Sequence, residues 1–271
     1  MRNVLLVSAA CVIITITVSA PLAADAVTIG ASKDATIFEN NVNNSNGAGP
    51  GIFAGTNGMD SPRRGLIDFD IAGNVPAGAT ITNVQLTLYL GQVAGGGSGA
   101  ETIGLFELEA DWGEGTTGSG AMIGGTGQGF PANPGDATWN ARFFPGTLWT
   151  TPGSDHDATA SATTVVGSTI NDPFTWLSTP ALVSDVQGWL DTPSSNFGWA
   201  LINLDETTPT DFRAFYTREF NGPTLRPELE ITFTPSTAVP EPTNITLLTL
   251  GMLGLVLGTR GRVFTLSNKH R

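Results

Sequence analysis

The sequence has almost no thiols or imidazoles. Among its 271 residues the one cysteine is Cys11, which lies in an apolar N-terminal stretch. The rest of the chain therefore cannot form a disulfide, use a thiolate nucleophile or build a zinc–thiolate site. Apart from a histidine at position 270, the chain contains only His156, between Asp155 and Asp157. A Ser-His-Asp hydrolase would have to use this residue as its base, but no serine nucleophile motif accompanies it, and we expect a surface loop there.

Positive charge is also scarce. The chain has 12 Lys and Arg against 24 Asp and Glu, and between Val27 and Pro235 there are seven basic residues against 22 acidic ones. Such a surface repels phosphate backbones and anionic headgroups, so nucleic acid is not expected as a partner. With 34 glycines and 17 prolines, the composition is typical of a turn-rich extracellular β protein.

The N-terminus has the features of an export signal. Arg2 provides a positive start, Val4 to Val18 form an apolar stretch, and small residues follow at 24–26 or 22–24 as a cleavage site. This order predicts a secretory signal peptide over residues 1–26.

The C-terminus carries a second apolar segment. Val239-Pro240-Glu241-Pro242 precedes an apolar run from Ile245 to Leu257, which is followed by Arg260 and Arg262. The run is shorter than the roughly 20 residues of a transmembrane helix, although flanking side chains that snorkel allow residues 243–259 to span. By the positive-inside rule the arginines stay in the cytoplasm, which places the acidic domain outside.

This tail resembles the PEP-CTERM sorting signal of bacteria that make exopolysaccharide. The resemblance assigns residues 236–271 to a sorting and membrane-anchor segment, and it implies an exosortase-type sorting enzyme as partner. The implied motif residues are Val239, Pro240, Glu241, Pro242, Arg260 and Arg262. An ordinary C-terminal anchor is the alternative, and it also places the domain at the cell envelope.

The segment between the two ends is rich in predicted strands. From Thr80 to Leu90 apolar residues alternate with mostly polar ones, as in a half-buried strand. Similar runs, separated by Gly, Pro and Asn, occupy Gly65 to Ile71, Glu101 to Leu108, Phe197 to Leu204, Phe212 to Thr217 and Leu229 to Thr234. We therefore expect residues 27–235 to form one all-β domain, an antiparallel β-sandwich or jelly roll.

One segment predicts a short helix. Between Thr179 and Leu190 the apolar residues recur at helical spacing, with Thr179 as N-cap and Pro180 at the first helical position. We expect this helix to pack over one end of the sandwich.

Several segments resemble the DNRLRE-type domain, a carbohydrate-binding-like β-sandwich family of secreted prokaryotic proteins. The similar segments are Arg64 to Ile71, Val75 to Ile81, Asp111 to Gly115, Asp136 to Asn140, Tyr216 to Glu219 and Leu225 to Leu229. The name-giving Asp-Asn-Arg-Leu-Arg-Glu string is absent, and residues 91–99 are unusually rich in glycine. The resemblance implies the sandwich fold and a carbohydrate-binding function.

Aromatic and arginine side chains are the candidate ligand-binding residues, because aromatic faces pack against sugar rings. We assign Trp112, Trp189 and Trp199 to the core. The loop residues Trp139, Trp149 and Trp176 are expected at a binding rim, with Arg142 as hydrogen-bond donor.

The other arginines of the domain are expected to be structural. We predict that Arg64, Arg218 and Arg226 pair with Asp70, Glu219 or Glu228.

Carboxylates suggest either calcium or catalysis. No cofactor is required, but loop oxygens could hold a structural calcium ion, with Asp34, Glu39, Asp155 and Asp157 as predicted ligands alongside Asn40 and Asn44. Paired carboxylates of a glycosidase could be Asp68 with Asp70, Glu107 with Glu109, or Asp111 with Glu114. A solvated acidic face explains these pairs equally well.

The sequence thus predicts an exported, non-enzymatic protein of the cell envelope that binds extracellular polysaccharide. A purely structural or adhesive surface module is the alternative, and a carboxylate-based glycan hydrolase or lyase is a weaker one.

Overall fold

The computed structural model describes residues 23–95, 99–118 and 127–236. Most of the predicted signal peptide and the sorting segment from 237 onward, including Val239 to Arg262, lie outside the described residues. The described residues belong to one compact unit that extends to Ser236. Among them, no helix combines the length and the hydropathy needed to cross a bilayer.

The described part of the chain is mostly antiparallel β-structure. Its strands are β1 (Asp25–Gly30), β2 (Lys33–Phe38), β3 (Asn44–Ser45), β4 (Gly51–Thr56), β5 (Pro62–Asp68), β6 (Thr80–Val93), β7 (Glu101–Glu107), β8 (Phe130–Pro131), β9 (Ala141–Phe143), β10 (Thr147–Leu148), β11 (Ala162–Val166), β12 (Pro173–Trp176), β13 (Trp199–Asn203), β14 (Arg213–Tyr216) and β15 (Glu228–Thr234). It has one α-helix, α1 (Pro180–Asp191), and short 3-10 turns at Glu39–Asn41, Pro193–Ser195 and Pro223–Leu225.

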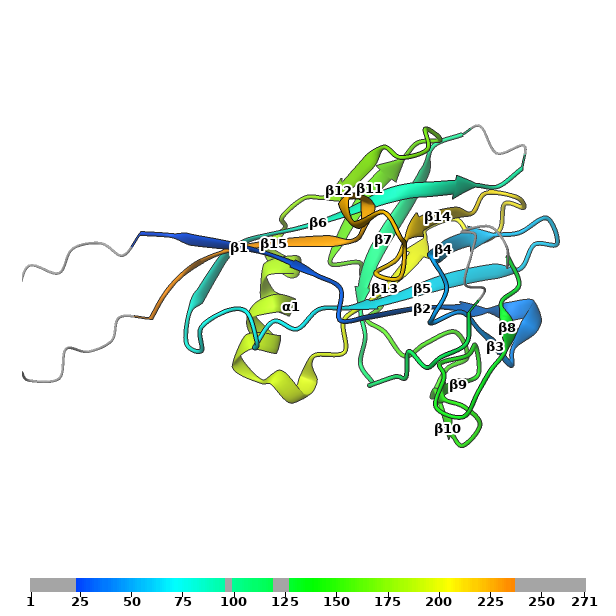
Figure 1. Cartoon of the computed structure of the whole chain (residues 1–271), viewed down its shortest axis with the longest axis horizontal. Coiled ribbons are helices and arrows are strands. Elements are labelled where there is room, and N and C mark those ends of the chain that lie inside the picture. Colours follow the sequence, from blue (N-terminus) through cyan, green and yellow to red (C-terminus); the bar gives the residue numbers. More distant parts are fainter. Residues whose placement is uncertain (1–22, 96–98, 119–126, 237–271) are drawn as a thin grey trace, which may run out of the picture. The chain divides into compact units, whose positions relative to one another are not determined.

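Eleven strands form one curled sheet (Figure 1). Its order is β1-β15-β6-β14-β4-β5-β13-β7-β11, with β12 also paired to β6 and β2 also paired to β5. Two small two-stranded sheets, β9 with β10 and β3 with β8, lie outside it. The predicted antiparallel all-β class with one short helix is therefore confirmed.

The strand and helix predictions agree with the structure in their main features. In β6 the alternating residues Val84, Leu86, Leu88 and Leu90 are all fully buried. In α1 the Thr179 hydroxyl accepts a hydrogen bond from the Leu182 N–H at 3.0 Å, which is the predicted N-cap. The buried side of α1 packs into the same apolar cluster as β6.

The middle of the sheet is covered on both faces. In β13, Trp199 and Leu201 point into a large core shared with α1 and β6. The intervening Ala200, together with Ile202, points the other way into a second, smaller core. The segment from Leu108 to Trp149, which contains β9 and β10, contributes Trp112, Trp139 and Trp149 to this smaller core.

The two ends of the described chain lie side by side. β1 pairs with β15, and Asp25 at the start of β1 is opposite Phe233 near the end of β15 (Figure 1). Phe233 in turn is paired with Ile81 near the start of β6. The chain therefore enters and leaves this part of the protein at the same end of β6.

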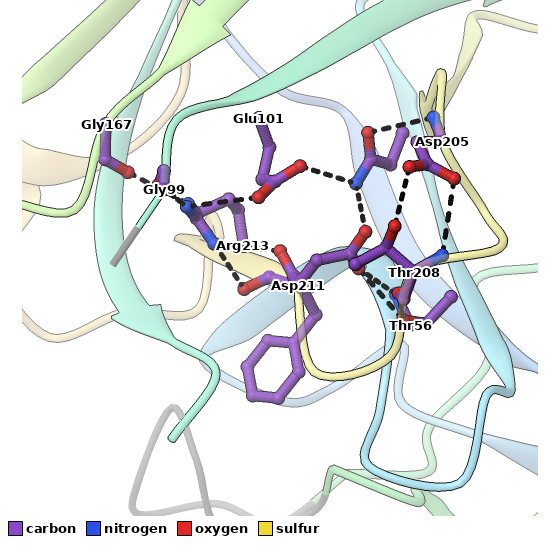
Figure 2. A network of polar contacts seen from close by, with 10 residues as sticks. Thr56, Gly99, Glu101, Gly167, Asp205, Thr208, Asp211 and Arg213 are labelled. Carbon is purple, nitrogen blue, oxygen red and sulfur yellow. Dashed lines mark hydrogen bonds and ion pairs between the residues drawn. The ribbon is translucent and has the colours of Figure 1, made fainter. Parts of the chain in front are cut away.

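A polar network secures the other end of β6. Arg213, which is opposite Val93, donates to the carbonyl of Gly167 at 2.8 Å and to that of Gly99, and lies 3.8 Å from Glu101 (Figure 2). The Asp211 carboxylate accepts from the Thr56 N–H at 2.6 Å and from the Asn203 amide at 2.9 Å. Because its groups bond to one another, the network joins the loops of this end and is structural.

Candidate functional site

Three acidic side chains from distant parts of the chain meet beside the sheet. Asp34 lies in β2, Glu114 follows β7, and Glu219 lies in the turn after β14. One carboxylate oxygen of each lies within 4.8 Å of the others. We call these three residues the carboxylate cluster.

Arg218 lies against the carboxylate cluster and bonds to each member. Its guanidinium donates to both oxygens of Glu114, at 2.7 and 2.5 Å, and lies 2.9 Å from Oε1 of Glu219. Its main-chain N–H donates to Oδ2 of Asp34 at 3.1 Å. The expected pairing of Arg218 with Glu219 is confirmed, but the two-pronged contact is with Glu114.

Local backbone geometry places Glu114. The next residue, Gly115, has φ of +73°, and a Cβ there would lie 1.5 Å from Oδ1 of Asp136. A Cβ on Gly47 would lie 1.8 Å from the Glu114 carbonyl oxygen. Glycine is therefore required at position 115, next to Asp136, and at position 47, next to the Glu114 carbonyl. This close packing fixes the Glu114 backbone against the neighbouring loops.

Burial sets the protonation behaviour of the cluster. Asp34 is fully buried, and burial together with the negative charge of Glu219 raises its pKa well above the usual range of an aspartate. Burial also raises the pKa of Glu219, against the opposing effect of Arg218. Oδ1 of Asp34 and Oε2 of Glu219 have no hydrogen-bond donor. Buried polar atoms in native proteins are normally bonded, so these two oxygens require an explanation.

The predicted metal ligands do not come together. Of Asp34, Glu39, Asp155 and Asp157, only Asp34 belongs to the cluster, which is the one group of three or more potential ligands within residues 23–95, 99–118 and 127–236. The Asp155 carboxylate instead accepts the N–H groups of Thr150 and Thr151, at 2.9 and 2.8 Å. That four-residue set is therefore wrong as a single metal site.

A polar pocket opens next to Asp155. It has a volume of about 390 Å³ and is lined by Glu109, Ala110, Thr150, Thr151, Ser154, Asp155 and His156. The Nδ1 atom of His156 lies 3.0 Å from the carbonyl oxygen and 3.2 Å from the hydroxyl of Ser154. The Ser154 hydroxyl therefore contacts Nδ1 of His156, whereas the serine of a serine hydrolase contacts Nε2 of its histidine.

The prediction of an exposed tryptophan rim is wrong. Trp139, Trp149 and Trp176 are 7%, 5% and 0% exposed. The indole N–H of Trp149 donates to the Thr138 carbonyl at 2.9 Å and that of Trp176 to the Ile103 carbonyl at 2.8 Å.

Trp139 and Arg142, which were also predicted at that rim, make contacts within the protein. The guanidinium of Arg64 lies 5.1 Å from the centre of the Trp139 ring. The predicted hydrogen-bond donor Arg142 donates to the Asp111 carbonyl at 3.1 Å. The three tryptophan rings are therefore parts of the two cores, and their faces are not available to a sugar.

A different carboxyl pair from those predicted lies under α1. Glu107 is hydrogen-bonded to Asp185, and burial raises the pKa of each. Trp189 donates to Glu107 at 2.9 Å, and Trp199 donates to Asp185 at 2.8 Å. Two carboxyl groups in direct contact leave no room for a glycosidic bond, so the pair resembles a structural contact more than a glycosidase centre.

No protein-family model and no curated protein matches this chain.

Proposed function

We propose that the protein is exported and held at the bacterial cell envelope as a non-enzymatic structural module. The support for location comes from the chain ends: the leader at residues 1–26 and the Pro-Glu-Pro motif with its apolar run and arginines in the tail. In this proposal an exosortase-type enzyme recognises the tail, and the tail anchors the protein to the membrane at least until it is processed.

The single structural observation that carries the proposal is the pairing of β1 with β15. Since Val27, the first residue after the predicted leader, lies opposite Ile231, the leader and the tail join the folded part at one end. A domain tethered through its tail then presents the opposite end of β6, with the Arg213–Asp211 network, away from the attachment point. That arrangement suits a display or adhesive role, and the buried tryptophans favour it over sugar binding by stacking.

The curled sheet fits a jelly roll of the DNRLRE type. Two segments that carry that resemblance lie on either side of β2: the Arg218 N–H donates to Asp34 in β2, and Asp34 lies opposite Ile67 in β5. A non-enzymatic role agrees with the Glu107–Asp185 pair, whose carboxyl groups contact each other and leave no room for a glycosidic bond.

Localisation tests the proposal directly. Cells of an exopolysaccharide-forming bacterium that produce the full chain are fractionated, and the termini of the protein are mapped by mass spectrometry. We expect the protein in the envelope or matrix with the leader removed near residue 26. Replacing Pro240, Glu241 and Pro242 by alanine should leave an unprocessed tail in the inner membrane, whereas the same changes at Pro131, Asn133 and Pro134 should not. Recovery of the intact chain in the cytosol, with the leader uncut, contradicts the proposal.

The polar pocket favours a second function, binding of a neutral polysaccharide. Its volume of about 390 Å³ falls within the range of small-molecule sites, about 300–1,000 Å³. Hydroxyl and carboxylate groups from Thr150, Thr151, Ser154 and Glu109 can exchange hydrogen bonds with sugar hydroxyls. The carboxylates of Glu109 and Asp155 repel uronic acids, which is why a neutral glycan is proposed.

Calorimetric titration with neutral oligosaccharides from the producing cell's own matrix tests this second function. Glu109→Gln should weaken binding about tenfold, the effect of losing roughly 1.4 kcal/mol of hydrogen bonding to a charged group. The matched control is Glu230→Gln, an exposed glutamate on β15 outside the pocket. Equal binding by both variants would show that the sugar binds outside this pocket. If the unmodified protein does not bind the sugar, only the structural role remains supported.

A further inference from the structure

We propose that Asp34, Glu114 and Glu219 bind a calcium ion that links three distant segments of the domain. The proposal does not depend on the location or on the polysaccharide proposed above. It assigns a metal site different from the one that the sequence suggests.

The spacing of the oxygens in the carboxylate cluster is compatible with calcium. Calcium takes oxygen ligands at about 2.3–2.6 Å, so two ligand oxygens on opposite sides of one ion are about 5 Å apart at most. The three oxygens of the cluster lie within 4.8 Å of one another. Magnesium is smaller, with ligands at about 2.0–2.1 Å in near-ideal octahedral geometry, and it retains its waters. We therefore expect calcium to bind better.

The two carboxylate oxygens that receive no hydrogen bond provide independent support for a ligand. Asp34 is 0% exposed, and its Oδ2 receives the Arg218 N–H while its Oδ1 receives no hydrogen bond. Oε2 of Glu219 is also a buried atom without a hydrogen bond, although the residue itself is partly exposed. An unbonded buried carboxylate oxygen is strongly destabilising, and a cation between the two residues would satisfy both atoms at once.

The charge of the cluster also matches a divalent cation. Three carboxylates face the guanidinium of Arg218, which bonds to Glu114 and Glu219. This leaves two formal negative charges in a largely buried place, where repulsion is weakly screened. The ligand atoms are all hard oxygens, and neither a thiol nor an imidazole belongs to the group, which favours calcium over zinc or copper.

The position of the ion gives it a structural role. Asp34 is 80 residues from Glu114, and Arg218 is 184 residues from Asp34. A bound ion would join β2, the loop after β7 and the turn after β14. Binding to the folded state alone raises the stability of that state in proportion to the logarithm of the ion concentration.

Thermal unfolding of the full-length protein tests the site. The melting temperature in EDTA is compared with that in Ca²⁺, and calorimetry gives the Kd and the number of ions. With Ca²⁺ about a hundredfold above the Kd, we expect the melting temperature to rise by about 5 °C or more. No rise, or an equal rise with Mg²⁺ at the same concentration, overturns the assignment to calcium.

Variants identify the ligands. Asp34→Asn and Glu219→Gln should each abolish the Ca²⁺-dependent rise, and in EDTA neither should melt below the unmodified protein, because each removes a charge from a repulsive cluster. Asp155→Asn and Glu39→Gln are the controls, since both carboxylates lie outside the cluster, and they should keep the full rise. If circular dichroism shows that Asp34→Asn does not fold, the test relies on Glu219→Gln, because Glu219 is only half-buried. A Ca²⁺ response retained in Glu219→Gln overturns the proposal.

Discussion

Trp176 and Leu177 are neighbours in the chain but occupy opposite environments. The Trp176 ring is 0% exposed and donates to the Ile103 carbonyl, whereas Leu177 is 66% exposed. We predict that Trp176→Ala lowers the free energy of unfolding by about 3–5 kcal/mol, because it leaves a large cavity. Leu177→Ala should change it by less than about 0.5 kcal/mol. Urea unfolding measures both, and a small effect at Trp176 would show that the ring is not part of the core.

Gly188 lowers the stability of α1. It is exposed in the helix interior, and a Cβ there meets no atom within 4 Å. Gly188→Ala should raise the free energy of unfolding by about 0.5–1 kcal/mol through the higher helix propensity of alanine.

Gly198 provides the matched contrast to Gly188. Its φ is +76°, and a Cβ would lie 2.0 Å from the Ile67 carbonyl oxygen. Gly198→Ala should therefore destabilise the protein by about 1–3 kcal/mol in the same urea titration. Equal effects of the two substitutions would contradict the backbone geometry described for this residue.

The Glu107–Asp185 pair predicts a pH dependence of stability. Burial and the charge of Asp185 raise the pKa of Glu107, and the charges of Asp157 and Glu109 add to this effect. A carboxyl with a raised folded pKa contributes its full stability below the unfolded value of about 4.3 and loses it as the pH rises through the folded pKa. In EDTA, this pair should therefore make the protein less stable at pH 7.5 than at pH 5.

Glu107→Gln tests that dependence. The amide stays neutral and can still accept the Trp189 N–H and donate to Asp185. At pH 7.5 the variant should be more stable than the unmodified protein, with a shallower slope towards pH 5. Glu230→Gln, at an exposed position of β15, should leave the slope as it is. Parallel pH curves for Glu107→Gln and the unmodified protein would rule out this origin of the dependence.

Arg213 is predicted to be essential for the far end of β6. It is 0% exposed and donates to the carbonyls of Gly99, Gly167 and Asp211. Arg213→Met should lower the free energy of unfolding by about 3 kcal/mol or more, because these carbonyls and Glu101 lose their partner. Arg142→Met, which removes one exposed hydrogen bond to a carbonyl, should lower it by less than about 1 kcal/mol. Chemical denaturation distinguishes the two, and similar losses would contradict the assigned role.

The features predicted well from sequence are local ones. The alternation in β6 and the cap at Thr179 depend on spacings of two to four residues, and both are as expected. The arginine partners were predicted less well, because they depend on chain segments far apart. Arg64 pairs with Glu206 at 2.6 Å rather than with Asp70, and Arg226 donates to the Phe220 carbonyl rather than pairing with Glu228.

Tertiary contacts also explain the errors at the candidate sites. Trp139 and Trp149 lie in a loop-rich segment, where the absence of a repeating pattern suggested exposure, but that segment folds over the sheet and buries them. Asp34 was identified as a ligand candidate, whereas Glu114 was considered with Asp111 and Glu219 with Arg218. Asp34 is 80 residues from Glu114, and Glu114 is 104 residues from Arg218, the neighbour of Glu219, which explains why spacing alone did not unite them.

The pairing of β1 with β15 has a mechanical consequence. β15 lies between β1 and β6, and its C-terminal end is at the end of the sheet where the chain leaves. A pull on that end, directed away from the far end of β6, acts along the strand. The hydrogen bonds on both sides of β15 are then loaded together in shear, instead of breaking one after another as they do when a strand is peeled away. A domain held by its C-terminus thus meets a pull with both hydrogen-bonded ladders of β15 at once.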